Sequence, residues 1–133
     1  MGNFLRRNSV VTAMIDTSDG LSTDLFHICQ ESGVSAEVWT AELPIAKEIR
    51  QQPNWKAALH AGEDYELLFT ASSKTKMKLP TRVAGVPLAP IGEIVGGRRR
   101  DASITLVEPG NKRSRLEPRG WQHFSRGENN RAR

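Results

Sequence analysis

Residues 10–33 predict a buried strand, a short acidic turn and an amphipathic helix in direct succession. The run VVTAMID at residues 10–16 is apolar and rich in β-favouring side chains, as is usual for a buried strand. From Ser18 to about Ser32 the apolar positions follow helical spacing, and Gly33 supplies the C-terminal stop. The apolar stripe of this helix consists of Leu21, Leu25, Ile28 and Cys29. We expect Cys29 to pack there as a small hydrophobe and not to act as a nucleophile.

The rest of the chain mixes short helices and short strands without strict strand–helix–strand alternation. Residues 34–40 alternate apolar and polar side chains, which predicts a half-buried strand. Pro53 separates two short helical segments. The other predicted elements are helices within 42–52 and 54–62, strands at 63–71 and 102–109, a polar connector at 72–80 and strand-like pieces within 82–97. This pattern predicts the α+β class, with a mixed β-sheet packed with helices.

Length and composition predict one soluble domain. With 133 residues, 38% of them hydrophobic and 26% charged, the chain can form one core but hardly two. We assign this domain to residues 10–124, with a lead-in at 1–9 and a disordered basic tail at 125–133. No apolar run reaches the length of a bilayer span and no signal peptide is recognisable, so we expect a cytoplasmic location and no membrane partner. One cysteine excludes an internal disulfide, and three scattered histidines predict no histidine metal cluster.

The net charge of +4 is concentrated toward the C-terminus. Residues 98–133 hold 10 of the 19 basic side chains and only 4 of the 15 acidic ones. Such clusters, with Arg98, Arg99 and Arg100 the densest, can contact nucleic-acid phosphates. No aromatic residues alternate with these arginines to stack on bases, so we favour solvated loops over a nucleic-acid partner.

The turn between the first strand and the helix contains Asp16, Ser18, Asp19 and Gly20. One interpretation is structural, because Ser and Asp are good helix N-caps and Gly and Asp form turns. The other is a metal–phosphate site, because two crowded carboxylates need a cation and a helix N-terminus favours anions. Mg²⁺ suits such a site, since it takes one or two carboxylates together with phosphate oxygens. On these residues alone, N-capping is the favoured interpretation.

Two further motifs carry candidate site residues. In AGEDYELLF, a turn of small residues places Glu63 and Asp64 at the start of a predicted strand. Acidic turns at the ends of two core strands suggest acids gathered at one edge of a sheet. In GWQHF, Trp121 and Phe124 follow a Pro-Arg-Gly turn, and such aromatics either cover the core or stack on a flat ligand.

These three motifs, in this order, resemble those of the thiamine-monophosphate kinase family, which belongs to the aminoimidazole ribonucleotide synthetase-related superfamily. The family's Asp-x-Ser-Asp-Gly-Leu turn is matched at residues 16–21, and its Gly-Gly-Glu-Asp-Tyr-Glu-Leu segment at residues 61–67 except for Ala61. Its Gly-aromatic-x-His-Phe ending is matched at residues 120–124. The likeness extends over about residues 12–124. The second and third motifs are more specific to this kinase than the first, which the whole superfamily shares.

The resemblance implies transfer of the γ-phosphoryl group of ATP to thiamine monophosphate, which yields thiamine diphosphate. It implies that Asp16 and Asp19 hold Mg²⁺ and that Ser18 meets the nucleotide phosphates. It further implies that Glu63 and Trp121 bind the substrate, Trp121 by stacking on a thiamine ring. No side chain is expected to act as a covalent catalyst, because such enzymes mostly position two anionic reactants.

Family members also have an N-terminal half that supplies most metal-binding aspartates, much of the ATP site and the dimer interface. This chain shows no counterpart of that half, so we expect the C-terminal, substrate-side domain, without kinase activity by itself. A separate N-terminal half or a homo-oligomer is the expected partner, and an exposed apolar patch is expected to cause concentration-dependent association.

The sequence alone leaves two alternatives. One is another enzyme of the superfamily, such as the purine-pathway cyclo-ligase, which the second and third motifs disfavour. The other is a non-catalytic domain: a remnant, a regulatory partner or a basic nucleic-acid-binding module.

Overall fold

The computed structural model describes residues 11–61, 66–74, 79–97 and 101–118. A two-stranded antiparallel sheet is formed by β1 (Val11–Thr17) and β3 (Glu66–Ala71). Its register places Thr17 opposite Glu66, so β3 begins beside the end of β1. Along β1 exposure alternates with period two, as expected for a strand with one covered face.

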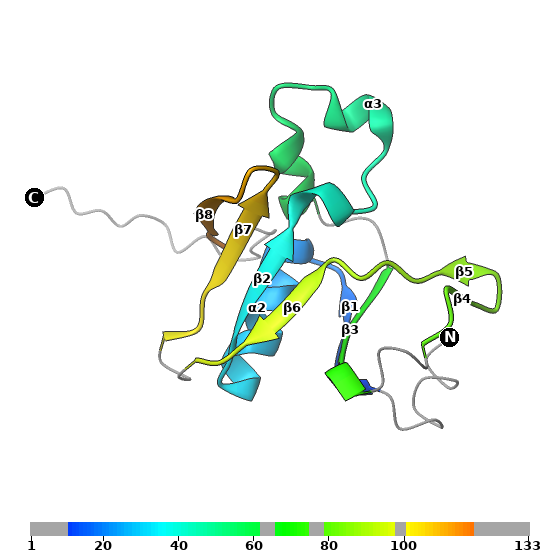
Figure 1. The fold of residues 1–133 in the computed structure, drawn as a ribbon, viewed down its shortest axis with the longest axis vertical. Helices are drawn as coiled ribbons and strands as arrows, with labels where there is room; N and C mark the ends of the chain where they lie inside the picture. Colours follow the sequence, from blue (N-terminus) through cyan, green and yellow to red (C-terminus); the bar gives the residue numbers. More distant parts are fainter. Residues whose placement is uncertain (1–10, 62–65, 75–78, 98–100, 119–133) are drawn as a thin grey trace, which may run out of the picture.

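A four-stranded mixed sheet forms the second layer, in the order β6-β2-β7-β8. The central strand β2 (Ser35–Trp39) runs parallel to β7 (Ile104–Glu108) and antiparallel to β6 (Gly92–Val95). The edge strand β8 (Lys112–Leu116) pairs antiparallel with β7. Figure 1 shows this sheet with the pair β1–β3 lying apart from it. The mixed sheets and helices confirm the α+β class.

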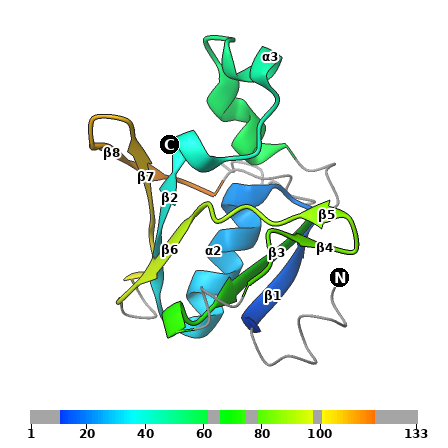
Figure 2. The ribbon, with the colours of Figure 1, turned by 45° about the vertical axis from the view of Figure 1, so that its right-hand side comes forward.

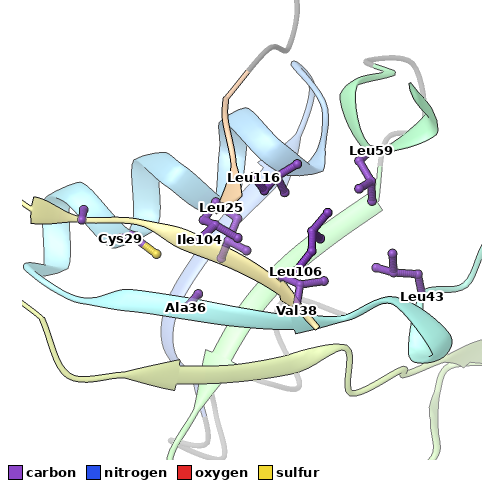
Figure 3. Close-up of a cluster of buried hydrophobic side chains, with 10 residues drawn as sticks. Leu25, Cys29, Ala36, Val38, Leu43, Leu59, Ile104, Leu106 and Leu116 are labelled. Carbon is purple, nitrogen blue, oxygen red and sulfur yellow. The ribbon is translucent and has the colours of Figure 1, made fainter. Parts of the chain in front are cut away.

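Helix α2 (Leu21–Ser32) lies between the two sheets and packs on β1, β2 and β7 (Figure 2). Its predicted apolar stripe is confirmed: Leu25, Ile28 and Cys29 are buried. The helix ends at Gly33, whose φ of 67° is the left-handed conformation that the predicted stop requires. Figure 3 shows Leu25 and Cys29 meeting Val38 from β2 and Ile104 and Leu106 from β7, in one continuous core.

In the described residues 40–61, the connection between β2 and β3 consists of short helical turns, as the sequence predicts around Pro53. These are η1 (Thr40–Glu42), α3 (Lys47–Arg50) and η2 (Trp55–His60). Arg50 holds them together: its guanidinium donates to the carbonyls of Thr40 and Leu43, at 2.8 and 2.7 Å, and lies over the Trp55 ring. Leu59 carries η2 onto the core, where it is 1% exposed.

The structure differs from the sequence-based prediction at two elements. The helix begins at Leu21 and not at Ser18, because Gly20 adopts φ 105°, ψ 151°, which is not helical. Strand β8 was not predicted, because four of its five residues are polar and exposed and only Leu116 faces the core. The remaining pieces are the short strands β4 (Arg82–Val83) and β5 (Val86–Pro87), which form a hairpin. Within the described residues, no helix has the length and apolarity needed to cross a membrane.

Candidate functional site

The acidic turn lies between β1 and α2, with Asp16 and Ser18 exposed and Asp19 half-buried. The N-cap of α2 is Gly20, and no side chain caps this helix end. The N-capping interpretation of these residues is therefore wrong: the acids and the serine sit before the helix without satisfying its first amides. Within the described part of the chain, the side-chain carboxylates of Asp16 and Asp19 make no hydrogen bond or ion pair.

A residue that the sequence analysis did not single out, Asp24, supports the turn from within the helix. Its carboxylate oxygen Oδ2 accepts a hydrogen bond from the backbone N–H of Asp19 at 3.0 Å. Asp24 is only 2% exposed, and a buried carboxylate needs such a partner. The sequence does carry a signal for it, since Asp24 falls on the apolar stripe three residues after Leu21 and directly before Leu25.

The turn is also packed against η2. A Cβ atom added to Gly20 would lie 2.8 Å from the backbone carbonyl carbon and oxygen of His60, so only glycine fits there. Two residues further on, the hydroxyl of Ser22 is hydrogen-bonded to Nδ1 of His60 at 2.7 Å. Ser22 is fully buried. Neither Ser22 nor His60 was singled out from the sequence, where an isolated serine and histidine give no pattern.

The ends of β1 and β3 are joined side by side by Thr17. Its hydroxyl donates to the carbonyl oxygen of Glu66 at 2.9 Å, and it accepts from the Glu66 N–H at 3.1 Å. The start of β3 thus adjoins the Asp16–Gly20 turn. Glu63 and Trp121 lie outside the described residues, so their predicted substrate-binding roles stay predictions.

The acids of this turn suit a hard cation. Asp16 and Asp19 offer carboxylate oxygens that no described side chain neutralises, and Mg²⁺ binds through one or two carboxylates plus substrate phosphates. The described residues contain no group of three or more His, Cys, Asp or Glu side chains able to hold a metal by themselves. A cation held by Asp16 and Asp19 would need further ligands, such as phosphate oxygens and water.

Basic side chains on β8 are partly neutralised. Arg113 pairs with Glu37, and Arg115 pairs with Glu117 at 3.0 Å. Arg98, Arg99 and Arg100 lie outside the described residues. The expected absence of a nucleic-acid partner remains a prediction.

Comparison with known proteins identifies the relatives of this chain. No known protein-family model matches it. The chain is 36% identical over 114 residues to thiamine-monophosphate kinase of Bacillus subtilis, covering 84% of this chain and 35% of that protein. It is 38% identical over 117 residues to thiamine-monophosphate kinase of Haemophilus influenzae, covering 83% of this chain and 35% of that protein.

Solved structures with a similar fold include one that carries the same family name as these relatives and one that is a ligand complex. AaThiL complexed with AMPPCP and TMP has a TM-score of 0.64 and 28% identity, over 92% of this chain and 37% of that one. Thiamine-monophosphate kinase from Stenotrophomonas maltophilia has a TM-score of 0.56 and 33% identity, over 75% of this chain and 33% of that one. The chain thus spans about a third of the length of the relatives it matches. It belongs to the thiamine-monophosphate kinase family and corresponds to the C-terminal portion of its members.

Proposed function

We propose that this chain forms the substrate-side part of an enzyme that transfers the γ-phosphoryl group of ATP to thiamine monophosphate. The observation that carries the proposal is the likeness to AaThiL, a protein solved with AMPPCP and TMP, over 92% of this chain. The unneutralised carboxylates of Asp16 and Asp19 at the turn before α2 support it. Because the chain spans about a third of its relatives, the activity, the substrates and the partners of the whole enzyme are part of this proposal.

In this proposal Asp16 and Asp19 hold Mg²⁺, and Ser18 donates a hydrogen bond to a nucleotide phosphate. The ion, when bound, neutralises charge between two anionic reactants. The N-terminus of the twelve-residue helix α2 has no side-chain cap and carries the positive end of the helix dipole, which favours phosphate at the same place. The exposure of Asp16 and Ser18 leaves both side chains accessible to a ligand.

The substrate is assigned to the second and third motifs. We propose that Glu63 contacts the cationic thiamine portion and that Trp121 stacks on one of its rings. Glu63 precedes β3 by three residues in the sequence, and β3 starts opposite Thr17; this register supports assigning the phosphate and thiamine contacts to one site. No protein side chain needs to form a covalent intermediate, because positioning and charge neutralisation carry the reaction.

The complete kinase is proposed to require the rest of the family's length, supplied by an N-terminal half or through a second copy. A cytoplasmic location also stays a prediction.

Fluorescence tests the binding part of the proposal. Thiamine monophosphate with millimolar Mg²⁺ is expected to quench the emission of Trp121. The Trp121→Ala variant should lose the change, whereas Trp55→Phe, which alters a residue stacked under Arg50, should retain it. Asp16→Asn should weaken the Mg²⁺ dependence without unfolding the protein, since Asp16 is exposed. Absence of quenching at millimolar ligand would contradict the proposed substrate site.

A further inference from the structure

The acidic turn is held from two sides by residues outside the family motifs described above. On the helix side, Asp24 accepts the Asp19 N–H at 3.0 Å. On the η2 side, the His60 backbone fits against Gly20, and Nδ1 of His60 is bonded to the Ser22 hydroxyl at 2.7 Å. Ser22 and Asp24 are 0% and 2% exposed, so both contacts are shielded from water.

We propose that Ser22 and His60 are positioning residues that fix the acidic turn against η2 and thereby support ligand binding at that turn. His60 is suited to this because it is the last residue of η2, the element that meets Gly20. A shift of His60 would move the support under Gly20. The link to ligand binding rests on the proposed function; the fixing of the turn does not.

The element η2, which supplies this support, is itself anchored to the core and to the four-stranded sheet. Leu59, next to His60, is 1% exposed within the core. Lys56, one helical turn earlier, is paired with Glu108 at the end of β7 at 3.2 Å. The turn is therefore braced against an element tied to the four-stranded sheet, while Asp16 itself belongs to the other sheet.

Amide hydrogen exchange of the full chain tests the fixing of the turn. The Asp19 amide should be protected in the unmodified protein, and Ser22→Ala and His60→Ala should each lower that protection on the order of fivefold, the effect of one lost hydrogen bond. His60→Asn should restore it, because the asparagine side chain can place a polar atom close to the position of Nδ1. Ser103→Ala, which removes a hydroxyl contact with Ser35 elsewhere in the domain, is the matched control and should leave Asp19 unaffected.

Two results would overturn the positioning role. One is equal Asp19 protection in all variants, with the Leu106 amide in β7 confirming that each is folded. The other is a loss of Asp19 protection in His60→Asn equal to that in His60→Ala, since this would indicate that the packing of the imidazole ring matters and the hydrogen bond does not.

Thiamine monophosphate affinity, measured with and without Mg²⁺ in the same variants, separates this inference from the proposed function. Affinity that falls about fivefold in Ser22→Ala and His60→Ala and is restored in His60→Asn supports both the positioning role and the proposed function. Unchanged affinity in variants with weakened Asp19 protection would overturn the link between the fixing of the turn and ligand binding. If the unmodified protein binds no ligand while the exchange pattern holds, the proposed function fails and the fixing of the turn stands.

Discussion

Thr17 and Glu66, 49 positions apart in sequence, are joined by two hydrogen bonds, because the Thr17 hydroxyl donates to the backbone C=O of Glu66 and accepts from its backbone N–H. Antiparallel strands exchange backbone bonds at such positions, and here a side chain adds to them at the place where the acidic turn departs. The first and second motifs are thereby connected through a residue, Thr17, that the first motif leaves unspecified. This contact makes the proximity of the two motifs testable.

Replacing Thr17 by valine keeps the shape of the side chain and removes both hydrogen bonds. We expect the free energy of unfolding to fall by about 1 kcal/mol, because the bonds are partly exposed to water. Thr12→Val is a matched control, since it removes the hydroxyl pair Thr12–Thr70 near the other end of the same strands. Urea denaturation should show similar losses for both variants. Only Thr17→Val should weaken thiamine monophosphate binding, and equal binding by the two variants would contradict a shared site.

Replacing Gly20 by alanine combines backbone strain with a collision against His60. We expect a loss of about 3 kcal/mol or more in the free energy of unfolding, since φ is 105° and the added Cβ lies 2.8 Å from backbone atoms. Gly110→Ala separates the two causes: its φ is 86°, but nothing lies within 4 Å, so it should cost only about 1 kcal/mol. Equal losses in the two variants would mean that the approach of His60 to Gly20 is unimportant for stability.

Burial raises the pKa of the Cys29 thiol from 9.0 to about 11. The folded state therefore favours the neutral thiol, and the resulting stabilisation is complete below pH 9.0 and is lost as the pH rises toward 11. Cys29→Ala should lack this component of the pH dependence. Urea denaturation of both proteins below pH 9.0 and near pH 11 measures it, and identical pH dependences would show that the thiol ionises equally in both states.

The face of the β1–β3 sheet turned away from α2 predicts self-association. Met14, 37% exposed, pairs with Phe69 on this face, whereas Leu68 on the opposite face packs on the core. We expect concentration-dependent oligomers in sedimentation velocity, weakened by Met14→Glu. Val86→Glu, at the 48% exposed side chain in β5, is the control and should leave association unchanged. Monomers at every concentration would refute this prediction.

Sequence patterns predicted the elements whose side chains repeat with a clear period. The stripe of Leu25, Ile28 and Cys29 and the αL stop at Gly33 were confirmed. The alternation that predicted β2 was confirmed for Ala36 and Val38, although Ser35 is buried as well. Strand β8 could not be predicted in this way, because an edge strand with one covered residue looks like a charged loop.

The site was predictable only in part, for a different reason. Asp16, Ser18 and Asp19 were identified by their spacing, but the start of α2 was placed three residues too early. Capping residues are common just before a helix, and a sequence does not show that Gly20 takes over the N-cap. Asp24 supports the turn through a hydrogen bond to Asp19, five residues earlier, which no capping pattern predicts. His60 supports it through a tertiary contact with Gly20, which lies 40 residues away in the sequence.

The pairing of β1 with β3 has a consequence for how this domain forms. The paired residues of the two strands are 49 or more positions apart in sequence, so the chain between them must close into a long loop before they can pair. Such a pairing is slow to nucleate. The contacts of α2 with β1 and β2 are between neighbours in sequence and can form earlier, whereas β2 joins β6 and β7 only across similarly long stretches. The carboxylates beside Gly20 should therefore acquire their final surroundings late in folding, so ligand binding at this turn would report on completion of the whole domain.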